Sequence, residues 1–265
     1  MKKIKGLLLL ISGILVLGAC SSGTKKTADA SDSKAKDTLV VGLDDTFVPM
    51  GFRDDDGKLT GFDIDLAKAV FALSDTKVKF QPIDWSMKEN EVKNGTIDMI
   101  WNGYTKTPER VKKVAFSDAY MKNTQMLVTT QKSGIDSIAK MKGKVLGAQE
   151  GSSGYNSFTK EPEVLQDIVK DQDATLYASF NEAFIDLESG RIDGLLIDKV
   201  YAEYYLTQND KIADFNLIES PYPQEDFAVG VRKDDKDLLK QINEGFEELK
   251  ENGEYDKITQ KWFSE

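Results

Sequence analysis

The chain has 265 residues, a net charge of −10, one cysteine and no histidine. The lack of histidine excludes histidine metal sites and histidine general bases, and the acidic balance argues against a nucleic-acid partner. The length fits one large domain or two modest ones, and a single cysteine excludes a disulfide framework.

Residues 1–19 have the form of a secretory leader. Three lysines lie within residues 1–5, and residues 6–19 are apolar apart from Ser12. This apolar run is too short to span a bilayer and is typical of a signal-peptide core. It ends in Leu17-Gly18-Ala19-Cys20, which resembles the lipobox of bacterial lipoproteins, in which the cysteine is lipidated and becomes the mature N-terminus. The alternative is an ordinary secretory signal with an incidental cysteine.

The segment 20–37 is predicted to be a flexible tether. From Ser21 to Asp37 it contains small, polar and charged residues and no large apolar one. Such a segment cannot bury enough surface to fold, so it serves as a spacer between a membrane and a domain. Removal of residues 1–19 takes away three lysines, and the net charge of the mature chain is then −13.

Beyond the tether, short strands and helices alternate, which indicates an α/β fold. Asp54 to Gly57 reads as a solvated turn, because the calcium-loop pattern with its distal Glu is absent. A helix opening at Thr60–Asp63 is predicted to bury Phe62, Leu66, Ala69 and Leu73 on one face. Strands are predicted at 39–43, 78–81, 97–101, 144–146, 192–195 and 227–231, and further helices at 86–93, from 107, from 179 to 190, at 235–252 and at 255–263.

The stretch Asn102 to Arg110 carries the strongest local signal. Thr107 and Pro108 predict a helix start, with Thr as N-cap and Pro at the first helical position. Arg110 then falls in the first turn, where a cation is unfavourable by roughly 0.3–1 kcal/mol because the free N–H groups make that end positive. Free N–H groups, the Thr105 hydroxyl and a guanidinium suit a bound carboxylate or phosphate. The alternative is a surface arginine that pairs with Glu109 or Asp118.

Residues 94–100 resemble residues 189–195, since both read as helix, Gly stop, turn, Ile-Asp and strand. Two similar α/β units suggest two lobes. Ligands of open α/β sheets lie beyond the carboxyl ends of the strands. The candidate residues are therefore those that follow each strand: Gly103, Thr105 and Arg110 after the first, and Asp198 after the second.

A third candidate is the run from Gly147 to Tyr155, which follows the strand predicted at 144–146. Small residues that lead into a helix leave backbone N–H groups free for an anion. The run lacks the lysine of a P-loop, and its glycines do not match the dinucleotide spacing. An ordinary turn between strand and helix is the alternative.

Several motifs together resemble solute-binding protein family 3, the extracellular receptors of polar amino-acid ABC importers. The resemblance covers Leu39 to Phe263. The motifs occur in the family's order: Gly61 to Ala67 (GFDIDLA), Thr107 to Arg110 (TPER), Phe116 to Tyr120 (FSDAY), and Glu251 to Tyr255 (ENGEY) followed by Lys261 to Phe263 (KWF).

The resemblance implies a two-lobed, periplasmic-binding-protein-like (type II) α/β fold that closes on its ligand. Two crossover hinge strands are expected near Tyr120–Thr124 and Pro223–Phe227. Lobe 1 is expected at 38–120 plus 228–265, and lobe 2 at 121–227 with hinge strands at both ends.

The same resemblance implies roles for single residues. Arg110, helped by Thr105 and Ser152, is expected to bind the α-carboxylate of an amino acid. The Gly103 carbonyl and the Asp198 carboxylate are expected to take the α-ammonium. Three residues are expected around the ligand side chain: Asp44, Phe47 and Trp85.

Each of these roles has a structural alternative. Asp198 could only cap the helix 199–206, Trp85 could be a core aromatic residue, and Asp44 could cap a loop. The notable departures from glutamine receptors of the family are Gln149 in place of a lysine and Ile197 in place of a histidine. With Asp44 and Glu150 nearby, these departures favour arginine, lysine or another polar ligand over glutamate.

The implied function is that of a monomeric, lipid-anchored receptor on the extracellular face of the membrane. It would carry no cofactor and no metal, and it would deliver its ligand to an ABC permease. The competing interpretations are a dehydratase-type enzyme on the same fold, a ligand sensor domain, and an adhesin with a vestigial pocket.

Overall fold

The computed structural model describes Lys36 and residues 38–264. The predicted leader 1–19, the predicted lipidation site Cys20 and almost all of the tether 20–37 lie outside the described residues. Within the described part of the chain, no helix is both long enough and apolar enough to cross a membrane.

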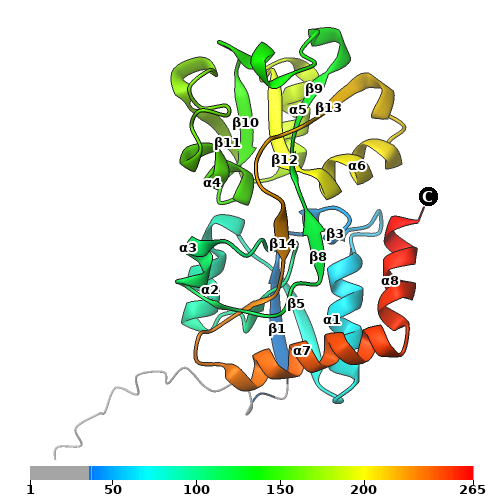
Figure 1. The fold of residues 1–265 in the computed structure, drawn as a ribbon. Helices are drawn as coiled ribbons and strands as arrows, with labels where there is room; N and C mark the ends of the chain where they lie inside the picture. Colours follow the sequence, from blue (N-terminus) through cyan, green and yellow to red (C-terminus); the bar gives the residue numbers. More distant parts are fainter. Residues whose placement is uncertain (1–35, 37, 265) are drawn as a thin grey trace, which may run out of the picture.

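Two α/β units lie one above the other and are joined by two extended segments (Figure 1). We call them lobe 1 and lobe 2. Lobe 1 is built on a five-stranded sheet in the order β5-β1-β6-β15-β7. β1 runs parallel to β5 and β6, whereas β15 runs antiparallel to β6 and β7. These strands are β1 Thr38–Leu43, β5 Lys77–Pro82, β6 Met99–Ile100, β7 Ala115–Phe116 and β15 Gly230–Val231.

Lobe 1 also holds a small three-stranded sheet and five α-helices. The small sheet consists of β2 Thr46–Phe47, β3 Gly51–Arg53 and β4 Leu59–Thr60. The helices are α1 Phe62–Ala72, α2 Lys88–Asn94, α3 Pro108–Val111, α7 Lys236–Glu251 and α8 Glu254–Phe263, with a 3-10 turn at Trp85–Met87 before α2.

Lobe 2 repeats the five-stranded arrangement in the order β11-β10-β12-β9-β13. Its strands are β9 Gln125–Thr130, β10 Leu146–Gln149, β11 Ala174–Tyr177, β12 Gly194–Asp198 and β13 Phe215–Glu219. Its helices are α4 Ser153–Lys160, α5 Phe180–Ser189 and α6 Lys199–Gln208, with 3-10 turns at Gln131–Ser133, Ile138–Met141, Lys170–Gln172 and Ile212–Asp214.

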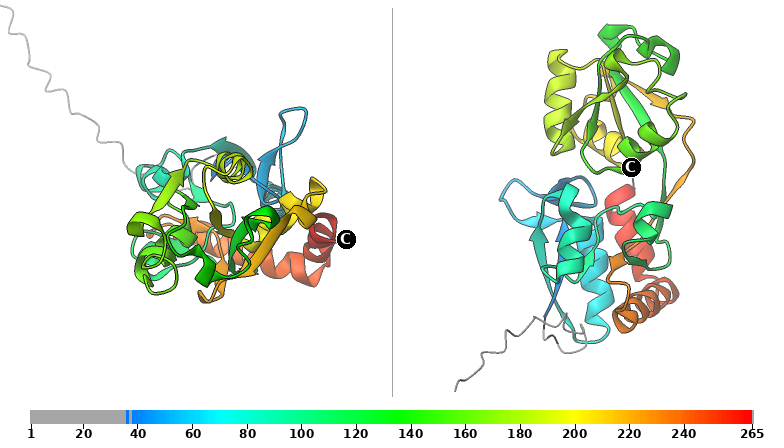
Figure 2. Two further views of the ribbon diagram at one scale, coloured as in Figure 1. Left: turned by 90° about the horizontal axis from the view of Figure 1, so that it is seen from above. Right: turned by 90° about the vertical axis from the view of Figure 1, so that its left-hand side faces the viewer.

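The two crossover strands are β8, Met121–Asn123, and β14, Glu225–Phe227. They pair antiparallel, with Glu225 opposite Asn123. Both connections run along the same side of the molecule (Figure 2, right). The predicted fold class, an α/β protein of two lobes with two crossover strands, is confirmed.

Local signals in the sequence located the helix ends well. Thr107 caps α3 by accepting a hydrogen bond from the Arg110 N–H, and Pro108 occupies the first turn. Ser179 and Glu182 form a reciprocal capping box on α5, and Gly190 ends that helix in the left-handed conformation. These contacts satisfy N–H and C=O groups that a helix end otherwise leaves without partners.

Three details of the predicted elements were wrong. The strand predicted at 227–231 is divided into β14 and β15, because the chain turns there from the hinge into the lobe 1 sheet. The strand predicted at 144–146 begins later and extends to Gln149, since the small residue Gly147 pairs with both neighbouring strands. Leu73, predicted on the buried face of α1, is 40% exposed because the helix ends at Ala72.

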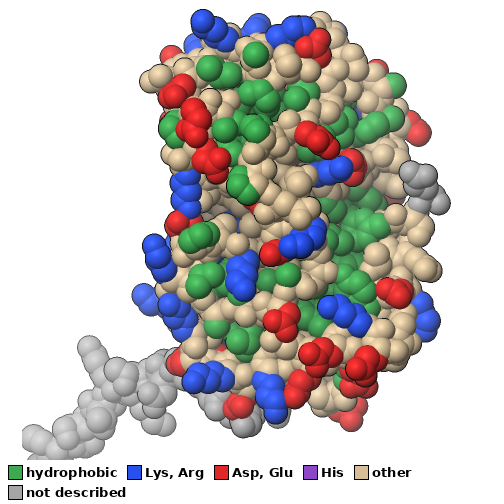
Figure 3. Space-filling model, viewed as in Figure 1, with side chains coloured by type: hydrophobic (Ala, Val, Ile, Leu, Met, Phe, Trp, Pro, Cys, Tyr) green, Lys and Arg blue, Asp and Glu red, His purple; other side chains and the backbone are tan. Residues whose placement is uncertain are grey.

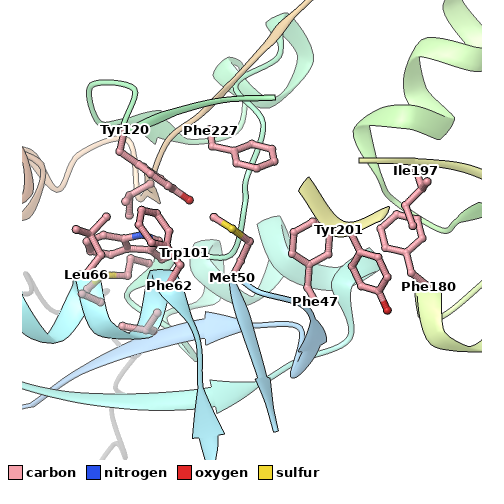
Figure 4. Packing of buried hydrophobic residues seen from close by; sticks show 14 of the residues in the cluster. Phe47, Met50, Phe62, Leu66, Trp101, Tyr120, Phe180, Ile197, Tyr201 and Phe227 are labelled. Carbon is pink, nitrogen blue, oxygen red and sulfur yellow. The ribbon is translucent and has the colours of Figure 1, made fainter. Parts of the chain in front are cut away.

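Buried apolar residues continue across the boundary between the lobes. Phe47 of lobe 1 lies 5.9 Å from Phe180 and 5.5 Å from Tyr201 of lobe 2, measured between ring centroids. Figure 4 shows these three rings beside one another, between the cluster around Trp101 and the strand that carries Ile197. The structure therefore represents the molecule with its lobes closed.

Candidate ligand-binding site

Arg110 lies at the boundary between the lobes and not on the surface. Its side chain is 8% exposed, and its guanidinium stands 4.6 Å over the ring of Tyr104. Nη1 donates to the Thr105 carbonyl at 2.9 Å, and Nη2 donates across the boundary to the Gly151 carbonyl at 3.0 Å. The surface interpretation is wrong, because Glu109 pairs instead with Lys160 of lobe 2.

A second cation, Lys88, lies beside Arg110 and was not predicted from the sequence. It is 2% exposed, and its ammonium donates to the carbonyls of Trp85 and Gly151, each at 2.9 Å. Burial, followed by the charge of Arg110, lowers the pKa of Lys88 to about 7. Glu89 lies 3.7 Å from Arg110 and 3.8 Å from Lys88 and offsets part of their charge. A cavity of about 240 Å³, lined in part by these three residues, opens between the lobes here.

Asp198 lies at the end of β12, where the carboxyl ends of the lobe 2 strands face lobe 1. Although it occupies the N-cap position of α6, its side chain makes no capping hydrogen bond, so the capping alternative is wrong. Oδ1 instead accepts from Asn123 Nδ2 at 2.5 Å and from Gln125 Nε2 at 2.9 Å. Burial, followed by the charge of Glu225, raises the pKa of Asp198 to about 8.

Thr105 is buried where the two lobes meet. Its hydroxyl lies 3.1 Å from the Ser153 hydroxyl of lobe 2 and 3.1 Å from Glu225 Oε2 of the hinge. The serine expected here was Ser152. Its hydroxyl instead caps α4 by accepting from the Tyr155 N–H, and its own N–H donates to the Gln149 carbonyl. The structure therefore brings the Ser153 hydroxyl to Thr105 and Glu225, whereas Ser152 lines the cavity beside Arg110.

Gly103 is held in a tight loop by Asp63. Its φ is +54°, and an added Cβ would lie 2.8 Å from Cε1 of Phe47, so a larger residue would push this ring away. The Gly103 N–H donates to Asp63 Oδ2 at 2.7 Å, and the Tyr120 hydroxyl donates to the same oxygen at 2.9 Å. Burial raises the pKa of Asp63 to about 7, although both donors favour the charged form.

The three residues expected around a ligand side chain lie at the lobe boundary in different settings. Phe47 packs against the lobe 2 rings described above. Trp85 is 7% exposed and meets Tyr104 edge-on at 5.9 Å, so its indole packs as part of the lobe 1 core. Asp44 caps its own loop through Thr46, and its second oxygen accepts from Gln149 of lobe 2 at 2.7 Å. Burial raises the pKa of Asp44.

Sequence reasoning missed three further polar residues that line this boundary, Asn123, Gln125 and Glu225, and it did not single out Ser153 within the candidate run 147–155. A usable signal for two of them was present. Side chains two apart along an extended chain share a face, so Asn123 and Gln125 project together from the first crossover. No comparable sequence signal marks Glu225, because its position depends on the pairing of β14 with β8.

The closed interface thus holds two buried cations with Glu89 beside them, and a second group of carboxylates. Lobe 1 supplies Arg110 and Lys88, whereas Asp198 of lobe 2 and Glu225 of the hinge supply carboxylates. On the outer face shown in Figure 3, acidic and basic side chains are instead interspersed over both lobes. Within the described residues, no group of three or more His, Cys, Asp and Glu is arranged to hold a metal ion. A buried cation and a buried anion held apart suit a ligand with both charges.

Two α/β lobes that close over buried polar groups define a solute-binding protein. Residues 39–265 match the family described as bacterial extracellular solute-binding proteins, family 3. The chain belongs to this family. It is a solute-binding transport protein, and the interpretation as a dehydratase-type enzyme is wrong.

Individual relatives cover nearly the whole chain. A glutamine-binding ABC transporter protein of Bacillus subtilis is 31% identical, and the alignment covers 100% of this chain and 98% of the relative. An arginine-binding extracellular protein of the same organism is 28% identical, with 98% of each chain covered.

Solved structures agree with the fold. A substrate-binding protein of an ABC uptake transporter from Streptococcus pneumoniae, with histidine bound, is 52% identical with a TM-score of 0.87, covering 89% of this chain and 98% of its own. An ancestral arginine-binding protein bound to arginine is 38% identical with a TM-score of 0.78, covering 86% and 99%.

Proposed function

We propose that this protein binds a polar L-amino acid between its two lobes and delivers it to the permease of an ABC uptake transporter. The observation that carries this proposal is that Arg110 of lobe 1 and Asp198 of lobe 2 are both buried where the lobes meet. An α-carboxylate would bind to Arg110 with help from Thr105, and an α-ammonium would bind to Asp198 and the Gly103 carbonyl. Both charges of the zwitterion would be desolvated only when the lobes close.

We further propose that the ligand carries a basic side chain. Phe47 and Trp85 place aromatic rings at the lobe boundary and Asp44 places a carboxylate there, and such groups suit a long or planar cation. An acidic side chain would be buried beside the Asp44 carboxylate, with the cations Arg110 and Lys88 already bound to main-chain carbonyls. Solved relatives with bound histidine and bound arginine agree with this choice.

A thermal-shift screen of the mature protein against the twenty amino acids tests both parts of this proposal. Histidine or arginine is expected to give the largest rise in melting temperature, followed by lysine and neutral polar residues. A larger rise with glutamate or aspartate would overturn the basic ligand and leave the amino-acid assignment intact. If no amino acid raised the melting temperature and none co-purified by mass spectrometry, the amino-acid assignment would be wrong.

We propose that the receptor acts as a monomer, attached to the outer face of the membrane through a diacylated Cys20. A single acyl chain gives only marginal attachment, so stable anchoring requires two. The segments 38–120 plus 228–265 and 121–227 would then move as the two bodies of the closing receptor. Replacing the cysteine, Cys20→Ser, is expected to release the protein into the medium or leave it unprocessed. A variant that stayed membrane-bound with a mature-length N-terminus would contradict the anchor.

A further inference from the structure

Glu225 of the hinge strand β14 reaches into the site from the side. Its Oε2 lies within hydrogen-bonding distance of four groups: the Thr105 hydroxyl at 3.1 Å, the Ser153 hydroxyl at 3.2 Å, Asn123 Nδ2 at 3.1 Å and Gln125 Nε2 at 3.0 Å. These donors come from lobe 1, from lobe 2, from the last residue of β8 and from the first residue of β9. Glu225 is therefore a connecting point of the closed site.

Glu225 and Asp198 share the same two amide donors. Asn123 Nδ2 and Gln125 Nε2 each donate to Asp198 Oδ1 as well as to Glu225 Oε2. Both amides turn their NH₂ groups toward the carboxylates, and their own oxygens are buried with no hydrogen-bond partner among the described residues. Two carboxylates thus stand side by side, which is costly unless a cation or a proton offsets their charge.

The lobe 1 cation whose charge favours the ionised form of Asp198 is Arg110. Its Nη atoms already donate to main-chain carbonyls, and its Nε lies beside Glu89. The carboxylate pair keeps two oxygens available, because Asp198 Oδ2 and Glu225 Oε1 accept no hydrogen bond from the described residues and neither is sealed from solvent. The two oxygens without a donor and the negative charge of the pair suit one more cation.

We propose that Glu225 is the second carboxylate of an ammonium subsite, so that the α-ammonium of the ligand binds between Asp198 and Glu225 when the lobes close. This inference rests on the proposed function. A primary ammonium has three N–H donors, and the proposed subsite would offer them the carboxylates of Asp198 and Glu225 together with the Gly103 carbonyl. The subsite therefore selects primary amines over N-methylated amino acids, which have one donor fewer.

The test compares the variant Glu225→Gln with the parent by calorimetry. The probes are histidine, arginine, and imidazolepropionate and 5-guanidinopentanoate, which lack the α-amino groups of these two ligands. Glu225→Gln keeps the shape and the hydrogen-bonding reach but removes the charge. The affinity for the amino acids is expected to fall about ten- to a hundredfold, as for the loss of one hydrogen bond to a charged group. The affinity for the compounds without the amine is expected to stay unchanged or to rise.

Asp226→Asn is the matched control. Asp226 is the next residue of the same strand, and it pairs with the exposed Lys122 outside the site. The variant Asp226→Asn removes one carboxylate from β14 and leaves Asp198 and Glu225 unchanged. Its affinity for the amino acids is therefore expected to equal that of the parent. Parental amino-acid affinity in Glu225→Gln would overturn the proposal, as would an equal loss for ligands with and without the amine. If the parent bound no amino acid at all, the proposed function itself would be wrong, so the two failures are distinguishable.

Discussion

The two lobes are built on the same plan but differ in the charged groups that follow their central strands. In each, a helix ends at a left-handed glycine, Gly95 or Gly190, and an Ile-Asp pair leads into the central strand. The aspartates of the two pairs, Asp98 and Asp193, make equivalent hydrogen bonds. Asp98 accepts from the Val40 N–H and Asp193 accepts from the Val145 N–H, each at 2.8 Å, and each thereby fixes its turn to the neighbouring strand.

The difference begins after that central strand. In lobe 1 the chain leaves β6 through a loop that runs from Trp101 to Thr107, and the short helix α3 then presents Arg110. In lobe 2 the chain passes from β12 directly into α6, so that Asp198 itself stands at the strand end. The shared scaffold thus brings the end of the central strand to the lobe boundary in both lobes. The connection that follows places Arg110 beyond a loop in lobe 1 and Asp198 at the strand end itself in lobe 2.

Removing the lobe 1 cation should give the largest effect. Arg110→Ala is expected to weaken amino-acid binding by about 2–5 kcal/mol, because the ligand carboxylate would be buried without its partner. Calorimetry measures this loss, and circular dichroism checks that the domain stays folded. Lys113→Ala is the control, since Lys113 is exposed and lies 3.9 Å from the same Glu89. If Arg110→Ala bound amino acids with the affinity of the parent, Arg110 of lobe 1 would not be the group that binds the ligand carboxylate.

Removing the lobe 2 anion should give a smaller loss. Asp198→Asn keeps an acceptor for the ligand ammonium but lacks the charge, so affinity is expected to fall by about 1.5–3 kcal/mol. Glu203→Gln on α6 is the control, because Glu203 is exposed and pairs with Lys199 away from the site. Equal affinities for Asp198→Asn and the parent would mean that the two lobes do not divide the charges of the ligand between them.

Asp63 supports the lobe 1 loop, and its titration should be measurable. Since burial raises its pKa from 3.8 to about 7, the folded state binds this proton more tightly than the unfolded state. Its contribution to stability is therefore complete below about pH 3.8 and is lost as the pH rises through 7. Asp63→Asn should flatten the fall in unfolding free energy between pH 5 and 7, measured by urea titration. The exposed Asp55→Asn serves as control, and an unchanged slope in Asp63→Asn would contradict the assignment.

Replacing Asp44 of lobe 1 should change the ligand affinity least. Asp44→Asn should weaken binding of arginine about two- to fivefold and leave binding of a neutral ligand such as glutamine nearly unchanged. The effect is small because both oxygens of the Asp44 carboxylate already accept hydrogen bonds from Thr46 and Gln149. Competition calorimetry with the two amino acids measures the ratio directly. An equal loss for both ligands would mean that Asp44 acts only through its hydrogen bonds to Thr46 and Gln149.

Much of this protein could be predicted from local sequence. Hydrophobic spacing, the Thr107-Pro108 start and the capping box at Ser179 located the helices, because these signals act between residues a few positions apart. The repeated Ile-Asp turns indicated two similar units, and the position of Arg110 in a helix first turn indicated an anion site. These inferences depend on backbone chemistry that is the same in any fold.

Only the tertiary structure decided how the site is assembled. Glu225 and Thr105 are 120 positions apart, and they meet because β14 pairs with β8 and because the lobes close. No local sequence pattern marks Lys88, whose ammonium donates to the Gly151 carbonyl of lobe 2 in the closed structure. Ser152 and Ser153 are adjacent residues of the same type. In the structure the Ser152 hydroxyl caps α4, whereas the Ser153 hydroxyl meets Thr105 of lobe 1. Such choices follow from long-range packing, which no local pattern records.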